Sequence, residues 1–214
     1  SSRYAYLIAA VAAVSGLLFG FDTAVINGAL LFLRQELGLS TRGTEVATSS
    51  LLVGCAIGAA FAGWLTDRFG RKRILIVSAL LFAVSAIGAA VPRHLGEFVA
   101  ARLVGGLAIG VASVLAPLYI AEISPRAIRG RLVSLNQMAI VTGILLAYFV
   151  NWLLSFGGPS SWRWMFASAA IPSIAFLVAL LFVPESPRFL VEKGREAEAL
   201  AVLERVGGVE PARL

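Results

Sequence analysis

The stretch GLLFGFDTAVINGALLFL, residues 16–33, contains seventeen uncharged residues and one charged residue, Asp22. About 20 apolar residues in a row are needed for a helix to cross the hydrocarbon core of a bilayer. An ionised carboxylate in such a helix costs at least ~2.5 kcal/mol if it faces lipid. The stretch therefore predicts a membrane helix whose single acid faces protein, and Asp22 becomes the first candidate functional residue.

The composition of the whole chain also indicates a lipid environment. Of its 214 residues, 59% are hydrophobic and only 14% are charged, and the mean hydropathy is +0.88, whereas a typical soluble domain is about 25% charged. A net charge of +6 could suggest a nucleic-acid partner. The basic residues, however, form short clusters between apolar runs, and no nucleic-acid-binding module is visible. We expect no nucleic-acid partner.

Six apolar segments are long enough to span a membrane, and most of the breaks between them are rich in charge, Pro or Gly. They lie at about 5–30, 45–66, 74–91, 97–121, 132–154 and 164–183. The runs are continuous and do not alternate as the ~10-residue strands of a membrane barrel would. The fold class is therefore an all-α polytopic membrane protein, with a transmembrane bundle at 1–184. Residues 185–214 follow, and 195–206 in that segment resemble an amphipathic surface helix with Leu200, Leu203 and Val206 on one side.

The distribution of Lys and Arg predicts the orientation of the bundle. Thirteen of the eighteen basic residues lie on the side of the bundle that carries both ends of the chain, and four lie in the opposite set of breaks. Basic residues accumulate in cytoplasmic loops, so we expect both ends of the chain to be cytoplasmic. The remaining basic residue, Arg102, lies inside the fourth span.

Asp22 and Arg102 are expected at similar depth, each in the outer half of its span. Opposite charges on different helices are the usual way to bury either one, so we expect the two side chains to meet inside the bundle, in a cavity, rather than in lipid. Two roles are open. The pair could be static and fix helix packing, or Asp22 could take up a proton when Arg102 turns away and lose it when Arg102 approaches.

The fifth span carries two amides, Asn136 and Gln137, near its start. Amides in membrane helices face the interior or a cavity, and they offer both donors and acceptors, which suits a neutral polyhydroxylated ligand. The alternative is hydrogen bonding between helices. Phe19 lies one helical turn before Asp22 and could stack on such a ligand or simply pack.

The sequence offers little that points to catalysis. Cys55 lies within an apolar run, and His94 lies in a short polar break. No nucleophile and base pair, metal cluster or phosphate-binding loop is visible. We expect neither an enzyme nor a bound metal or cofactor.

Four stretches together resemble the sugar porter family of the major facilitator superfamily. GWLTDRFGRKR (63–73) resembles the superfamily's motif between helices 2 and 3. VGGLAIGVASVLAPLYIAEISPRAIRG (104–130) closely matches the family signature. PESPRFL (184–190) resembles the motif after helix 6, and GLLFGFDTAVING (16–28) is similar to helix 1 of proton-coupled members. The four occur in the family's order and span the chain.

The resemblance implies a fold and a set of roles. Spans 1–3 and 4–6 would be inverted repeats that form the amino-terminal six-helix half of a twelve-helix transporter in a bacterial inner or plasma membrane. Gln137 matches a sugar-binding glutamine, Asp22 the proton-coupling aspartate and Arg102 its arginine partner, with a proton as the coupling ion. The residues that match a charged cytoplasmic gate network are Asp67, Arg68, Gly70, Arg71, Glu122, Arg129, Glu185 and Arg188.

Two departures leave parts of that assignment open. Ile144 stands where some members carry a second glutamine, so the sugar is not specified. No second six-helix half follows in the sequence, and we expect a fragment or a partner half on another chain. The function expected is sugar/proton symport with a monosaccharide and membrane lipid as partners. The alternatives are a facilitator without proton coupling, and a non-transporting sugar sensor or assembly partner on the same scaffold.

Overall fold

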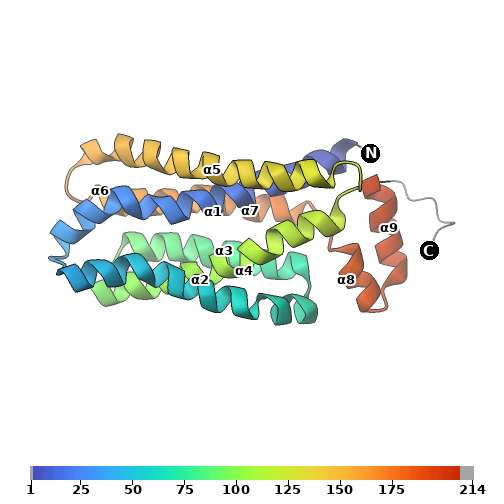
Figure 1. Cartoon of the computed structure of the whole chain (residues 1–214), viewed down its shortest axis with the longest axis horizontal. Coiled ribbons are helices and arrows are strands. Elements are labelled where there is room, and N and C mark those ends of the chain that lie inside the picture. Colours follow the sequence, from blue (N-terminus) through green and yellow to red (C-terminus); the bar gives the residue numbers. More distant parts are fainter. Residues whose placement is uncertain (1, 208–214) are drawn as a thin grey trace.

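The computed structural model describes residues 2–207, and within that range the chain forms helices and no strand. Six spans are long and apolar enough to cross a membrane. They run nearly parallel to one another in an elongated bundle (Figure 1). The helices that build them are α1 (Ser2–Glu36), α2 (Thr41–Phe69), α3 (Arg71–Ala90), α4 (Leu95–Ile123), α5 (Arg129–Leu154), and the pair α6 (Ser161–Ser168) and α7 (Ala170–Leu181).

The sixth span is broken into α6 and α7 at Ala169. Pro172 explains the break, because proline lacks an N–H donor and its ring clashes with the carbonyl group four residues earlier, here that of Ser168. Pro117, by contrast, lies inside α4 without interrupting it. A 3-10 turn at Ser155–Gly157 connects α5 to the loop before α6.

Helices from the two halves of the bundle pack against each other reciprocally. α1 packs mainly on α5, and α2 packs mainly on α4. Glycine makes both contacts close: a Cβ atom on Gly20 would lie 1.9 Å from the carbonyl oxygen of Ile140, and one on Gly110 would lie 2.1 Å from that of Cys55. The backbones therefore touch directly, as small residues allow in membrane bundles. If α1–α3 form one three-helix unit and the remaining three spans form the other, the first helix of each unit packs on the second helix of the other unit. Inverted repeats produce this reciprocal arrangement.

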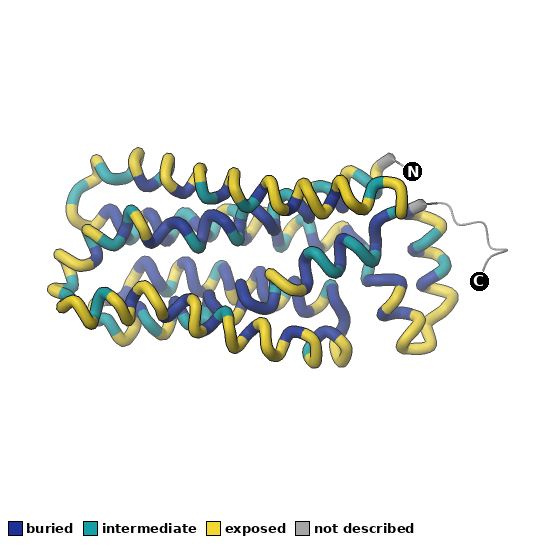
Figure 2. Tube along the Cα trace, viewed as in Figure 1, coloured by how far each residue is buried: buried dark blue, intermediate teal, exposed yellow. Residues whose placement is uncertain are grey.

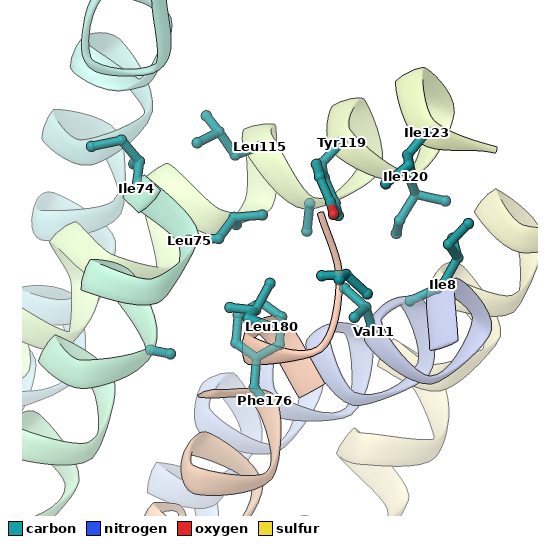
Figure 3. Close-up of a cluster of buried hydrophobic side chains, with 14 of the residues drawn as sticks. Ile8, Val11, Ile74, Leu75, Leu115, Tyr119, Ile120, Ile123, Phe176 and Leu180 are labelled. Atoms are coloured by element: carbon teal, nitrogen blue, oxygen red, sulfur yellow. The ribbon is translucent and has the colours of Figure 1, made fainter. Parts of the chain in front are cut away.

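Side chains between these helices form two buried clusters. Figure 3 shows the first, in which Val11 of α1, Leu75 of α3, Tyr119 of α4 and Leu180 of α7 converge. The outer faces of the bundle expose many large apolar side chains, as the alternating colours along α2 and α5 show (Figure 2). Such surfaces suit lipid, because they would be unfavourable in water over this area.

Two short helices, α8 (Pro187–Glu192) and α9 (Glu196–Gly207), lie at the end of the bundle where α1 begins (Figure 1). We call this the α8–α9 end and the opposite end the far end. The amphipathic helix expected at 195–206 is present, but Ala199, Val202 and Val206 form its buried side, while Leu200 and Leu203 are only half-buried. Residues 208–214, the last part of the predicted 185–214 segment, lie outside the described residues.

Candidate functional site: a buried ion pair, a cavity and a charged cluster

Asp22 and Arg102 form an ion pair inside the bundle. The Arg102 Nη1 atom donates to Oδ1 of Asp22 at 3.1 Å, and Nη2 donates to the main-chain oxygen of the same residue at 3.3 Å. Asp22 is 3% exposed and Arg102 is 1% exposed. The expectation that these two charges meet inside the bundle and away from lipid is therefore confirmed.

An aromatic cluster lies beside this pair. The Arg102 guanidinium lies 5.1 Å from the ring centre of Phe166, which makes edge contacts with Phe98 and Trp162. Asp22 Oδ2 and Arg102 Nε have no hydrogen-bond partner among the described residues. Because an unsatisfied polar atom in a low-dielectric site is costly, each charge depends strongly on the other.

A cavity of about 300 Å³ opens within the bundle near the ion pair. Asp22 and Arg102 do not line this cavity, and both side chains are almost fully enclosed by protein. α1, α3, α4, α5 and α7 all contribute to the cavity wall. Its polar lining consists of Ser15, Ser113, Asn136 and Gln137, and Phe19 lies on the same wall.

The two neighbouring amides of α5 differ in their surroundings. Asn136 is buried, and its Nδ2 atom donates to the main-chain oxygen of Ala12 and to Oγ of Ser15, each at 2.8 Å. Its amide nitrogen thus ties α5 to α1, which favours the helix-packing alternative. Gln137 is exposed on the cavity wall and forms no hydrogen bond with the described residues. Gln137 is therefore the amide that a ligand in the cavity could use.

A cluster of charged side chains lies at the α8–α9 end, centred on Arg71. The Arg71 side chain is 4% exposed, and it donates to both carboxylate oxygens of Glu122, at 3.1 and 3.3 Å. Asp67 and Glu192 lie farther away, each 3.7 Å from Arg71 Nη1. Arg188 also reaches Glu122, at 3.9 Å. A bidentate contact of this kind between arginine and a carboxylate fixes the orientation of the two side chains as well as their distance.

Glu185 joins the same cluster through the main chain. Its Oε1 atom accepts hydrogen bonds from the backbone nitrogens of Arg71 at 3.0 Å, Lys72 at 2.9 Å and Ser186 at 2.9 Å. The carboxylate therefore satisfies the first free N–H groups of α3, where the helix dipole favours negative charge. Gly70 makes room for it, since φ is +97° there and a Cβ atom would lie 2.5 Å from Glu185 Oε2.

Two arginines of the predicted network form no ion pair within the described part of the chain. Arg68 lies over the rings of Trp64 and Phe69, at 5.7 and 5.6 Å from their centres. Arg129 donates to the main-chain oxygen of Ser124 at 3.4 Å. Both are exposed at the α8–α9 end, where water competes for their charge. For these two arginines, the motifs predict correctly which end of the bundle they occupy, but they do not predict an ion-pair partner.

Sequence reasoning missed several members of this cluster. The hydroxyl of Ser186 donates to Glu122 Oε2, and Glu192 contacts both Arg71 and Arg188. The hydroxyl of Tyr119 donates to the main-chain oxygen of Pro184, which anchors the segment before α8. Ser186 stands inside the PESPRFL stretch and Tyr119 inside the stretch 104–130, so both had a usable signal, whereas Glu192 lies outside every quoted stretch.

A second missed cluster lies at the far end. Glu36, the last residue of α1, accepts hydrogen bonds from Trp162 Nε1 at 2.7 Å and from Arg163 Nη2 at 2.8 Å. Arg163 also donates to the main-chain oxygens of Ala90 and Pro92 at 3.0 and 2.8 Å. The cluster joins the ends of α1, α3 and α6. Its members are distant in sequence, so no local motif marks them.

The chain resembles known sugar transporters in both sequence and structure. The family described as "Sugar (and other) transporter" matches residues 8–214. The chain is 46% identical over 92% of its length to the "Putative metabolite transport protein YwtG" of Bacillus subtilis and covers 43% of that protein. It is 40% identical over 97% of its length to the "D-xylose-proton symporter" of Escherichia coli and covers 49% of it.

Solved structures agree. The proton:xylose symporter XylE, in a complex with 6-bromo-6-deoxy-D-glucose, superposes with a TM-score of 0.90 and 39% identity. That match covers 97% of this chain and 50% of the XylE chain. The chain thus spans about half the length of the curated relatives it matches. These relatives are transporters rather than enzymes, and the six apolar helices make this a multi-pass membrane protein. The chain belongs to the sugar transporter family, within the sugar porters of the major facilitator superfamily.

Proposed function

We propose that this chain is the amino-terminal six-helix half of a sugar/proton symporter, in which Asp22 is the proton site and Gln137 contacts the sugar. Relatives named for symport of xylose and arabinose support the class of transport. The observation that carries the proposal is the buried pair of Asp22 and Arg102, because an ionisable pair within membrane helices is a candidate functional site by default.

The contacts of the pair suggest how a proton would alter the bundle. Of the two hydrogen bonds from Arg102, only the one to Oδ1 depends on the carboxylate charge; the one to the main-chain oxygen does not. Protonation of Asp22 would therefore weaken the hold of α4 on the side chain without releasing α4 from α1. This is a graded change of contact, which suits a step that must reverse in every transport cycle.

The cavity supplies a place for the sugar one helical turn away. Phe19 of α1 stands on its wall and precedes Asp22 by three residues, and Ile109 of α4 stands on the same wall two turns after Arg102. Because the ion pair does not line the cavity, sugar and proton would communicate through small movements of α1 and α4. A volume of about 300 Å³ lies at the lower limit for small-molecule sites, and a second half facing this one would complete the site.

The remaining assignments concern the gate and the membrane. The cluster of Arg71, Glu122 and Glu185 joins α3 and α4 to the segment before α8, and it would break and re-form as the site opens to the cytoplasm. The excess of basic residues at the α8–α9 end supports a cytoplasmic position for that end. The second six-helix half, in the same chain or another, is the proposed partner, in a bacterial plasma membrane.

Proton coupling is tested by replacing Asp22 in proteoliposomes that contain the complete transporter. We expect Asp22→Asn to abolish uphill accumulation driven by a pH gradient, because the group that takes up the proton is removed. Exchange of labelled sugar should be preserved, because the Asn amide oxygen and the main-chain oxygen can still accept hydrogen bonds from Arg102. Glu45→Gln is the matched control, since Glu45 is an exposed acid that forms no ion pair among the described residues. It should accumulate sugar as the unaltered protein does.

The alternative is facilitated diffusion with a static pair, and the tight, fully enclosed contact of Asp22 with Arg102 is the observation that favours it. That alternative predicts no change of external pH during sugar uptake, whereas symport predicts alkalinisation that Asp22→Asn removes. Accumulation that survives in Asp22→Asn would refute the assignment of Asp22 as the proton site.

A further inference from the structure

A second cavity, of about 520 Å³, lies on the outside of the bundle at the α8–α9 end. α2, α3 and the segment from Glu185 to Arg195 enclose it. Its walls carry five cationic residues, one acid and three apolar residues. The cationic residues are Arg68, Lys72, Arg73, Lys193 and Arg195; the others are Glu185, Phe69, Ile76 and Phe189.

Most of this positive charge is not neutralised by protein. Arg68, Lys72, Arg73 and Lys193 form no ion pair among the described residues, and only Arg195 has an acidic partner, Glu198, at 2.7 Å. The single acid on the wall, Glu185, accepts three backbone N–H groups through Oε1, and its one negative charge is outnumbered by the four unpaired cations. The cavity therefore presents an excess of positive charge that an anion would balance.

The position of the cavity identifies which anion fits. Lys72 Nζ donates to the main-chain oxygen of Leu181, the last residue of α7, at 3.5 Å. The cavity thus lies where α2, α3 and α7 leave the apolar part of the bundle. Phe69, Ile76 and Phe189 form the apolar part of its wall. Phe69 is also exposed, as are Val77 of α3 and Phe182 directly after α7. A ligand here would have one charged end and a long apolar remainder.

We propose that this cavity binds the phosphate headgroup of an anionic phospholipid, whose acyl chains lie along α3 and α7. Basic pockets at the ends of membrane helices favour such headgroups, and each nearby Lys or Arg strengthens the attraction. A soluble phosphate ester would satisfy the same cations but would gain nothing from the exposed apolar side chains beside them. The proposal does not depend on sugar transport or on which side of the membrane the α8–α9 end faces.

The chain carries a suitable internal probe. Of its four tryptophans, Trp64 alone lies at the α8–α9 end, where Arg68 stacks on its ring at 5.7 Å. Trp152, Trp162 and Trp164 lie toward the far end. The protein is reconstituted in phosphatidylcholine vesicles that contain a minor fraction of acyl-brominated phosphatidylglycerol or, in parallel, acyl-brominated phosphatidylcholine. The part of the tryptophan fluorescence quenching by brominated lipid that is lost in Trp64→Phe reports lipid beside the cavity.

We expect brominated phosphatidylglycerol to quench Trp64 more strongly than brominated phosphatidylcholine at the same fraction, with no such difference for the far-end tryptophans. Lys72→Gln combined with Arg73→Gln should weaken the phosphatidylglycerol preference roughly tenfold or more. Arg126→Gln combined with Arg131→Gln is the matched control, because both are exposed at the same end, do not line the cavity and remove equal charge. This control should keep the preference.

The remaining outcomes each decide the question. Equal loss in the two double variants would mean a diffuse attraction to surface charge and would overturn the site, as would an unchanged preference in Lys72→Gln combined with Arg73→Gln. Displacement of the brominated lipid by millimolar glycerol 3-phosphate would assign the cavity to a soluble phosphate ester instead. Quenching of the far-end tryptophans shows whether Lys72→Gln combined with Arg73→Gln inserts into the vesicles. If it does not, Lys193→Gln, at the end of α8, is used in its place, and its phosphatidylglycerol preference should also weaken.

Discussion

Arg102 holds Asp22 through two acceptors of different kinds, the carboxylate Oδ1 at 3.1 Å and the main-chain oxygen at 3.3 Å. One contact responds to the charge of the aspartate and the other does not. The pair can therefore change strength without separating α1 from α4. Close packing on Phe166 restricts where the guanidinium could go if it left the carboxylate.

Loss of Arg102 should cost more than loss of both partners. Arg102→Met leaves the buried Asp22 carboxylate unpaired, and breaking a buried pair in this way typically costs about 3–5 kcal/mol. In the double variant Asp22→Asn, Arg102→Met, no charge remains to be compensated. We expect the double variant to melt at a higher temperature than Arg102→Met alone, as measured by thermal unfolding in detergent.

Arg188→Met serves as the control for loss of an arginine, since its side chain is 66% exposed and exposed ion pairs contribute only ~0–1 kcal/mol. It should melt close to the unaltered protein. A double variant that melts below Arg102→Met would contradict the pairing argument.

Gly70 should be intolerant of a side chain. Its φ of +97° is strained for any other residue, and a Cβ atom would lie 2.5 Å from Glu185 Oε2 and 2.9 Å from Phe189 Cε1. Gly70→Ala should therefore displace Glu185 from the start of α3 and lower the melting temperature. Gly63→Ala, in α2 with nothing within 4 Å, is the control. It should be neutral or stabilising, since Ala is favoured over Gly in a helix by about 1 kcal/mol. Equal effects from both would argue against the clash.

Glu185 should matter more for stability than Glu192, although both belong to the same cluster. Glu185→Ala removes the acceptor of three backbone N–H groups, and leaving such groups without a partner costs about 1–3 kcal/mol. Glu192→Ala removes contacts of 3.7 and 3.2 Å at a side chain that is 42% exposed. The two melting temperatures, measured side by side, should differ accordingly, and a larger loss in Glu192→Ala would reverse the ranking.

The spans of this fold were predictable because each is an uninterrupted apolar run, which only a membrane helix accommodates at that length. The helices extend beyond those runs at most ends, since polar residues such as Thr41 and Arg129 continue the backbone hydrogen bonds once the chain leaves the apolar region. The break at Ala169 follows from Pro172, whereas nothing in the sequence distinguishes Pro117, which α4 absorbs.

The candidate site was predictable where charge has to be compensated. Two opposite charges within membrane helices have few possible partners, so Asp22 and Arg102 could be matched from depth alone. The sequence could not tell which of Asn136 and Gln137 packs against α1 and which faces the cavity. Adjacent residues on a helix point about 100° apart, and the sequence does not show which of the two directions faces α1. Contacts such as those of Glu36 with Trp162 and Arg163 depend on how the loops bring distant helix ends together.

The difference between the two amides leads to a prediction that separates binding from packing. Gln137→Ala should weaken sugar binding by roughly twofold to tenfold, the effect of one lost hydrogen bond, with little change in melting temperature, because Gln137 bonds to no described residue. Asn136→Ala should do the reverse, since it removes both hydrogen bonds from α5 to Ala12 and Ser15 of α1. The measurements are the KM for sugar uptake and thermal unfolding of each variant. If Asn136→Ala raised KM while its melting temperature stayed unchanged, Asn136 rather than Gln137 would be the ligand contact, and the division of roles between the two residues would have to be exchanged.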